Sequence, residues 1–253
     1  MDTTTVSDRE RYLFDLQGFL VVPDALTPQH CAELDAEMTR RLASEADPVI
    51  AKHRFEQRGP LLAWGKAWCR LLDNPRIMPY LSEFIGDEIR LDHEYAEAIR
   101  PGRGPLGSTL HGGATPFDEC FFYLHKNGRI RSALTVVAYA LRDVHPGDGG
   151  FGCIPGSHKS NYPVPAGWHD LDHPAPCISA VSVKAGSAVI FTEALAHGTL
   201  PWCGSDERRT VFYKYSPRTI SWSSRRYDAT AYPGLSPVQA ALLEGPNARY
   251  PWR

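Results

Sequence analysis

The sequence predicts a mainly β fold with flanking helices, in which two sheets pack face to face as a cupin-like jelly roll. Three observations support this prediction. The chain has 253 residues, a length that suits one large β domain. Its 21 glycines and 21 prolines are spread between short segments, as turns are in β proteins. From residue 89 onward, short apolar runs rich in β-branched and aromatic residues alternate with these turn clusters.

The N-terminal part of the chain, about 1–88, is expected to be mostly helical. A short helix over 9–17 leads through a glycine into an apolar strand at 19–22, which a proline ends. A second helix is predicted to start where Thr27 can cap its N-terminus and Pro28 can occupy its first position. Apolar residues recur in it at intervals of three and four, which predicts one buried face: Cys31, Leu34, Met38 and Leu42.

The jelly-roll core is expected at about 89–220, and a C-terminal extension follows over 221–253. The whole chain, 1–253, is expected to form a single domain. Four runs within the core have the length and composition of strands: 89–96, 132–141, 187–191 and 210–215. The helices are expected to pack on one side of the sheets.

Composition argues against several classes of protein. The 27 lysines and arginines are balanced by 29 acidic residues, so no nucleic-acid polymer or anionic membrane is expected as a partner. The sequence contains no basic and apolar leader and no apolar run of roughly 18 residues, and we expect a cytoplasmic protein. The six cysteines lack zinc-ligand spacing and are expected to serve as small apolar residues in a reducing cytosol. A small-molecule substrate is the expected partner, and the oligomeric state stays open.

Two histidines carry the strongest chemical signal. His111 is followed by two glycines, and His197 comes shortly after an apolar run. Non-haem Fe(II) oxygenases hold iron with two histidines and one carboxylate. In a His-x-Asp motif both side chains reach one ion, because residues i and i+2 of a strand face the same way. Here Gly113 takes the aspartate position without offering a side chain, which would leave one more coordination position open to a halide.

Several motifs together resemble the phytanoyl-CoA dioxygenase family of Fe(II)/2-oxoglutarate oxygenases. They extend over nearly the whole chain: Phe19-Leu20-Val21-Val22-Pro23, Leu141-Arg142-Asp143-Val144, Pro146-Gly147-Asp148-Gly149-Gly150, Ile154-Pro155-Gly156-Ser157-His158-Lys159, Gly186-Ser187-Ala188-Val189-Ile190-Phe191, and His197 with Arg208 downstream. The resemblance implies a double-stranded β-helix, Fe(II) bound by His111 and His197, and 2-oxoglutarate and O2 as cosubstrates. At Gly113 the sequence departs from the family, which normally has aspartate there.

The resemblance also implies which residues bind 2-oxoglutarate. Arg208 matches the family position that receives the distal carboxylate, and a guanidinium suits a carboxylate through two parallel hydrogen bonds. Thr199 matches the position whose hydroxyl assists that carboxylate. Arg209 competes with Arg208 for the role, but adjacent residues of a strand face opposite ways, so only one of them should enter the site.

The missing aspartate predicts a halogenase. Chloride beside Gly113 would be transferred to an unactivated carbon of the substrate. The His-x-Gly pattern resembles the halogenase branch of the family, whose members chlorinate small molecules in the biosynthesis of antibiotics and other secondary metabolites. One candidate substrate by this resemblance is a nucleotide, 2′-deoxyadenosine monophosphate, chlorinated at its 2′ carbon, and the substrate stays open. Residues that can clamp a phosphate or stack on a base are present: Arg100, Arg103, Tyr123, Lys126 and Lys214.

Two other functions stay open. Asp118 or Glu119 can loop back across Pro116 to replace the missing ligand, which would make the protein an Fe(II)/2-oxoglutarate-dependent hydroxylase with a displaced carboxylate. A non-catalytic, cupin-like ligand-binding protein that has lost iron is the other alternative. His158 looks catalytic within its Pro-Gly-Ser-His-Lys segment, but it is expected to shape a loop.

Overall fold

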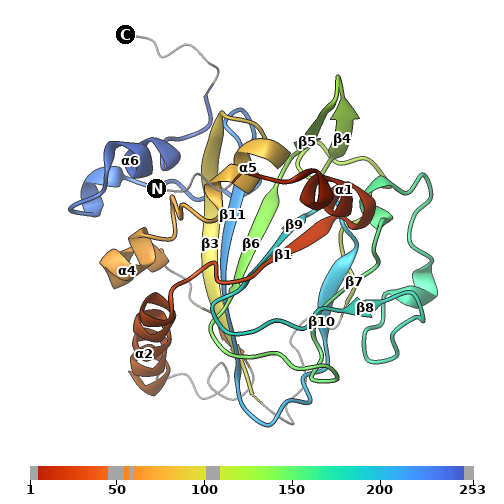
Figure 1. Ribbon diagram of the computed structural model, residues 1–253, viewed down its shortest axis with the longest axis horizontal. Helices are drawn as coiled ribbons and strands as arrows, with labels where there is room; N and C mark the ends of the chain where they lie inside the picture. The colour runs from red at the N-terminus through yellow and green to blue at the C-terminus, as the bar shows by residue number, and fades with distance from the viewer. Residues whose placement is uncertain (1–4, 45–53, 57–59, 101–108, 248–253) are drawn as a thin grey trace.

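The computed structural model describes residues 5–44, 54–56, 60–100 and 109–247 (Figure 1). The described part of the chain is mainly β, which confirms the predicted fold class. Its strands are β1 (Phe19–Val22), β2 (Arg54–Glu56), β3 (Ile89–Ile99), β4 (Tyr123–Lys126), β5 (Arg129–Ser132), β6 (Thr135–Ala140), β7 (Gly150–Cys153), β8 (Ser179–Ala180), β9 (Ala188–Thr192), β10 (His197–Leu200) and β11 (Arg208–Pro217). Its helices are α1 (Asp8–Gln17), α2 (Pro28–Ser44), α4 (Lys66–Cys69), α5 (Met78–Phe84) and α6 (Pro237–Leu242), with short 3-10 helices η1 (Leu61–Trp64), η2 (Ser157–Lys159), η3 (Ala166–Trp168) and η4 (Ala229–Ala231).

Two sheets of unequal size form the jelly roll. The large sheet has six antiparallel strands in the order β1-β9-β6-β11-β3-β2, and the small sheet has the order β10-β7-β8. Strands β4 and β5 form a separate hairpin. Helices α2, α4 and α6 lie on one side of the large sheet, and the small sheet lies on the other (Figure 1). The large sheet is therefore covered on both faces.

The N-terminal helices begin at side-chain caps that the sequence encodes. Ser7 and Glu10 form a capping box at the start of α1, which ends at Gly18 with a left-handed φ of 83°. At α2 the predicted cap is present, because the backbone N–H of His30 donates to Oγ1 of Thr27 at 3.2 Å. These caps satisfy donors that the first turn of a helix leaves without partners.

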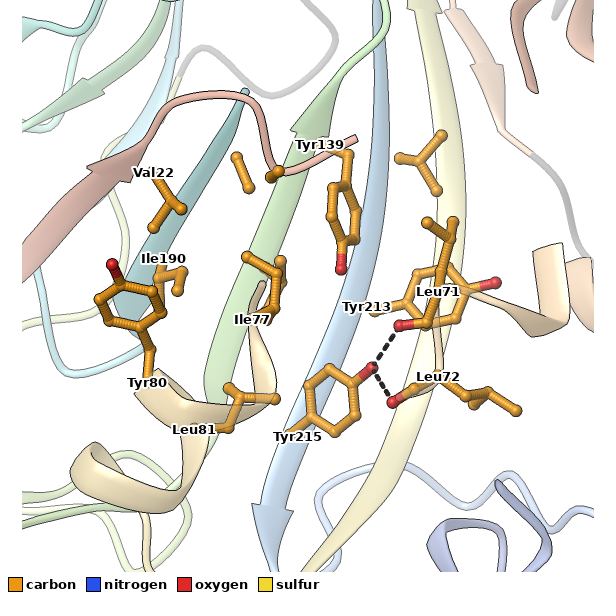
Figure 2. Close-up of a cluster of buried hydrophobic side chains, with 14 of the residues drawn as sticks. Val22, Leu71, Leu72, Ile77, Tyr80, Leu81, Tyr139, Ile190, Tyr213 and Tyr215 are labelled. Carbon is orange, nitrogen blue, oxygen red and sulfur yellow. Dashed lines mark hydrogen bonds between the residues drawn. The ribbon is translucent and has the colours of Figure 1, made fainter. Parts of the chain in front are cut away.

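The outer face of the large sheet packs against the helices and forms the main core. Alternate residues of β11 point to this face, among them the fully buried Tyr213 and Tyr215. The hydroxyl of Tyr215 donates to the carbonyl oxygens of Leu71 and Leu72, at 3.1 and 2.9 Å (Figure 2). Apolar burial and satisfied hydroxyl groups thus fix the chain that precedes α5 on the sheet.

The inner face of the large sheet differs in chemistry from the outer face. A smaller apolar cluster lies between the two sheets, and it includes Phe151 from β7, Phe191 from β9 and Phe212 from β11. The residues of β11 on either side of Phe212 that share its face are polar or charged, notably Arg208 and Lys214. Because side chains alternate along a strand, β11 separates an apolar outer face from a charged inner one.

Candidate functional site

His111 lies beside His197, the first residue of the edge strand β10 of the small sheet. They form an isolated antiparallel bridge, in which the backbone N–H of each donates to the carbonyl oxygen of the other at 2.9 and 2.8 Å. Directly opposed residues of such a pair place their side chains on the same face. The two imidazole rings are accordingly 4.2 Å apart between centroids. The two predicted metal ligands, which are 86 residues apart in the sequence, are therefore neighbours in the structure.

Both imidazoles are oriented by backbone carbonyl groups. Nδ1 of His197 is 2.6 Å from the carbonyl oxygen of Leu195, and Nδ1 of His111 is 3.2 Å from that of Thr109. A carbonyl oxygen can only accept, so Nδ1 carries the proton and Nε2 presents its lone pair. Metal-binding histidines are commonly fixed in this manner.

A carboxylate that the sequence analysis missed completes the group. Ligand atoms of His111, Glu193 and His197 all lie within 4.8 Å of one another, and Oε2 of Glu193 is 3.9 Å from Nε2 of His197. Glu193 begins the turn that joins β9 to β10, and this turn crosses from the large sheet to the small one. A glutamate four residues before His197, followed directly by the apolar residues Ala194, Leu195 and Ala196, was the signal in the sequence that could have indicated it.

The two glycines after His111 have a structural explanation. A Cβ atom at Gly112 would lie 2.5 Å from the carbonyl oxygen of Leu195 and 2.6 Å from that of Glu193. Gly113 has a φ of 108°, which side chains rarely permit, and its N–H donates to the carbonyl oxygen of Ala194 at 3.0 Å. The segment therefore lies tightly against the turn that carries Glu193. The carboxylate comes from this turn rather than from position 113.

Lys214 on β11 forms an ion pair with Glu193, and the two side chains are 11% and 7% exposed. Burial would raise the pKa of Glu193, but Lys214 and His197 outweigh burial and hold this pKa at about 2. Burial together with the neighbouring His111 lowers the pKa of His197 to about 3. At neutral pH the site consequently holds an ionised carboxylate and a neutral buried imidazole, the protonation states that bind a metal ion.

A cavity of about 330 Å³ extends from the histidines along the inner face of the large sheet. Arg208 and Thr199 both line it, from β11 and β10 respectively. Arg208 is buried there beside Glu97 of β3, and its Nη1 is 3.9 Å from Oε2 of that glutamate. Two cations, Arg208 and Lys214, and the carboxylate of Glu97 thus line the cavity between aromatic walls formed by Tyr95, Phe151, Phe191 and Phe212, and Glu193 lies behind Lys214 as its ion-pair partner.

The structure separates the two candidate arginines. Arg209 points to the opposite face of β11, where it pairs with Asp35 of α2 at 2.9 Å and with Glu207 at 2.8 Å. It therefore joins the sheet to a helix, while Arg208 faces the cavity. Alternation along the strand accounts for this difference.

Most residues considered for a nucleotide pocket lie elsewhere. Arg100 pairs with Glu207, and Tyr123 donates to Oδ1 of Asp15 at 2.6 Å within the outer core. Lys126 is exposed at the end of β4, and Arg103 lies outside the described residues. Lys214 lines the cavity but is paired with Glu193.

Three other polar residues also lie apart from the histidine group. Asp118 and Glu119 are exposed, and Oδ1 of Asp118 accepts from the backbone N–H of Cys120. The metal-binding group found among the described residues includes neither carboxylate. His158 is buried against α1, with Nε2 3.0 Å from the carbonyl oxygen of Asp15, so it supports a loop, as expected.

Comparison with known proteins identifies a family over most of the chain. The sequence profile described as phytanoyl-CoA dioxygenase (PhyH) matches residues 14–210. This range includes both histidines, Glu193 and Arg208. The comparison with curated proteins gives no match.

Solved structures of low sequence identity share the fold. HygX from Streptomyces hygroscopicus with nickel and 2-oxoglutarate bound is 22% identical, with a TM-score of 0.77, and the match covers 88% of this chain and 92% of HygX. HygX with nickel, 2-oxoglutarate and hygromycin B bound is 23% identical, with a TM-score of 0.75 and coverage of 88% and 91%. SnoN, a non-haem α-ketoglutarate-dependent epimerase of nogalamycin biosynthesis, is 19% identical, with a TM-score of 0.60 and coverage of 84% and 83%. Among the described residues, no helix is long and apolar enough to span a membrane.

Proposed function

We propose that this chain, which belongs to the phytanoyl-CoA dioxygenase (PhyH) family of Fe(II)/2-oxoglutarate-dependent oxygenases, oxidises a C–H bond of a small molecule at an iron held by His111, His197 and Glu193. The observation that carries this proposal is the buried carboxylate of Glu193 beside two imidazoles with available Nε2 atoms. Two histidines and one carboxylate are the ligand set of non-haem Fe(II) oxygenases. Glu193 would replace the aspartate that Gly113 cannot supply.

The residues around the triad suit 2-oxoglutarate. Arg208 offers a buried guanidinium inside the cavity, and the Thr199 hydroxyl lies on the facing strand. Together they would bind the distal carboxylate of the cosubstrate through charge-assisted hydrogen bonds. The bound iron and 2-oxoglutarate supply the activation of O2 for oxidation of the substrate. Phe151, Phe191 and Phe212 would exclude water from this volume.

Charge balance favours oxygenation over halogenation. The divalent iron and the dianion of 2-oxoglutarate cancel each other, and the Arg208 and Lys214 cations cancel the Glu97 and Glu193 carboxylates. An added chloride would leave one uncompensated negative charge in a buried cavity, which is energetically costly. The proposed activity is therefore oxidation with a displaced carboxylate ligand.

Halogenation is the second candidate, and it rests on the missing side chain at position 113. A Cβ atom at Gly113 would meet only the Cγ2 atom of Val164 within 4 Å, at 3.9 Å, but Gly113 lines another cavity, together with Val164, and is not among the residues that line the histidine cavity. If Lys214 keeps Glu193 away from iron, the third ligand position becomes available to chloride. A nucleotide substrate has less support, because Lys214 alone among the four described residues considered for it lines the cavity.

Substitution of Glu193 tests the proposed ligand. Glu193→Gln removes the charge and keeps the shape, and we expect Ni(II) affinity, measured by titration calorimetry, to fall roughly 100-fold, or about 2.7 kcal/mol. Fe(II)-dependent conversion of 2-oxoglutarate to succinate should be lost as well. Glu97→Gln is the matched control, because Glu97 is an equally buried carboxylate that lines the cavity and does not belong to the histidine group. Unchanged Ni(II) affinity in Glu193→Gln would refute the ligand assignment.

Chloride separates the two candidate activities. For the oxygenase, the anaerobic absorption band of the Fe(II)/2-oxoglutarate complex should not change with chloride concentration, and products should gain oxygen or lose hydrogen. For the halogenase, the band should shift with chloride, and mass spectrometry of products from candidate substrates should show incorporated chlorine. Chlorinated product from the native protein would establish the second candidate.

A further inference from the structure

Lys214 occupies an unusual place in the cavity for a residue that the proposed reaction does not require. Its ammonium group contacts Oε1 of Glu193, and the residue is 9% exposed. The rings of Tyr95 and Trp222 lie 5.5 and 5.9 Å from its Nζ atom, measured to the ring centroids. Lysine is rarely buried unless it is paired with an opposite charge, so the contact with Glu193 accounts for its place here.

The two oxygens of Glu193 face different partners. Oε1 accepts from Lys214, which comes from the large sheet, while Oε2 is 3.9 Å from Nε2 of His197 on the small sheet. The ammonium thereby fixes the side chain so that the second oxygen points toward the histidine pair. A metal ion bound there would take one carboxylate oxygen and leave the other on Lys214.

The Lys214 ammonium has its main effect in the metal-free enzyme, where it is the cation next to Glu193. A buried carboxylate without a counter-ion is strongly unfavourable, and a carboxylate that rotates away would have to be reoriented before it binds metal. When a divalent cation arrives, it takes over the stabilisation of Glu193, and the lysine becomes a neighbouring positive charge. Lys214 thus helps the empty site more than the loaded one.

We propose that Lys214 is a positioning residue that takes the place of the metal: it holds the Glu193 side chain in its orientation in the metal-free enzyme and leaves a single carboxylate oxygen to the metal. This inference rests on the proposed function, since it takes Glu193 as a ligand. It has a distinctive consequence. Loss of the ammonium destabilises the metal-free protein more than the metal-bound protein, and by thermodynamic linkage the variant must then bind metal more tightly.

The test uses the full chain with Ni(II) as the metal, because Ni(II) binding can be measured without turnover. Lys214→Met retains most of the side-chain volume without the charge, Lys214→Arg restores the charge, and Lys184→Met is the control at an exposed lysine. We expect Lys214→Met to lower the Tm of the metal-free protein by roughly 5 °C. The Tm of the Ni(II)-bound Lys214→Met protein should fall by less than this. The Kd of the variant for Ni(II) should fall at least about threefold. Lys214→Arg and Lys184→Met should resemble the native protein.

The possible outcomes distinguish an error in the role of Lys214 from an error in the proposed function. Equal losses of Tm with and without Ni(II), or weaker Ni(II) binding by Lys214→Met, would overturn the role of Lys214 alone. A native protein that binds no Ni(II) would overturn the proposed function and this inference together. If Lys214→Met does not fold, the double variant Lys214→Met/Glu193→Gln decides. It should fold if the unpaired carboxylate caused the failure, because removal of both charges is nearly neutral, and its failure to fold would show that Lys214 acts only through packing.

Discussion

The two faces of the large sheet differ in chemistry although the same strands form both. On the outer face of β11, Val211, Tyr213 and Tyr215 are fully buried against helices and make an apolar core. On the inner face, Arg208 and Lys214 are almost as buried, but each lies beside a carboxylate. Consecutive residues of β11 therefore belong alternately to the apolar core and to the charged wall of the cavity.

This difference shows how the fold separates stability from function. Apolar burial on the outer face contributes favourable free energy wherever the side chains fit. Paired charges on the inner face contribute little net stability, since desolvation offsets their attraction. Substitutions on the outer face should accordingly change unfolding, and those on the inner face should mainly change ligand affinity.

The largest effect is expected on the outer face, at Tyr213. Tyr213→Ala removes a fully buried ring and the hydrogen bond from its hydroxyl to the Trp68 carbonyl oxygen, 2.8 Å away. The expected loss in free energy of unfolding is about 3–5 kcal/mol, measured by urea denaturation. Tyr213→Phe, which loses only the hydroxyl, should cost about 1 kcal/mol. A small loss for Tyr213→Ala would show that this face is not the stabilising one.

Arg208 and Arg209 allow the two faces of β11 to be compared at adjacent residues of the same type. Arg208→Met should weaken 2-oxoglutarate binding in the presence of Ni(II) by roughly 100-fold, or about 2.7 kcal/mol, in calorimetric titrations. Arg209→Met should leave that affinity unchanged and lower the free energy of unfolding, because it breaks the ion pairs with Asp35 and Glu207. The reverse pattern would contradict the assignment of the two faces.

Much of the fold could be predicted from local patterns. Strand β1 has the predicted bounds, and α1 begins one residue before the predicted 9–17. The predicted strand 132–141 is shorter in the structure, because residues 129–132 form β5 of a hairpin with β4. Asn127 and Gly128 at its turn both have positive φ, which is a hairpin signal that the sequence analysis did not use.

The site could be predicted only where its residues lie in motifs. His111, His197 and Arg208 were selected from motifs, and the structure places all three on one cavity. Glu193 was missed because its role depends on how the turn between the sheets folds back against Gly112 and Gly113. A contact between two segments far apart in the sequence leaves no trace in the spacing of apolar residues along either segment. Substrate residues were harder still, since Arg100 and Tyr123 have partners that only tertiary structure supplies.

The smallest effect is expected at Thr199, on the wall of the cavity opposite the large sheet. Thr199→Val keeps the side-chain shape and removes one hydroxyl, which would bind 2-oxoglutarate alongside Arg208. We expect 2-oxoglutarate affinity in the presence of Ni(II) to fall about fivefold, equivalent to about 1 kcal/mol for one hydrogen bond. The free energy of unfolding should change little, because Thr199 is only partly buried. Thr210→Val is the comparison on the facing sheet, since Thr210 lies between Arg208 and Phe212 on the inner face of β11. A loss of affinity in Thr210→Val but not in Thr199→Val would place the cosubstrate against the large sheet alone.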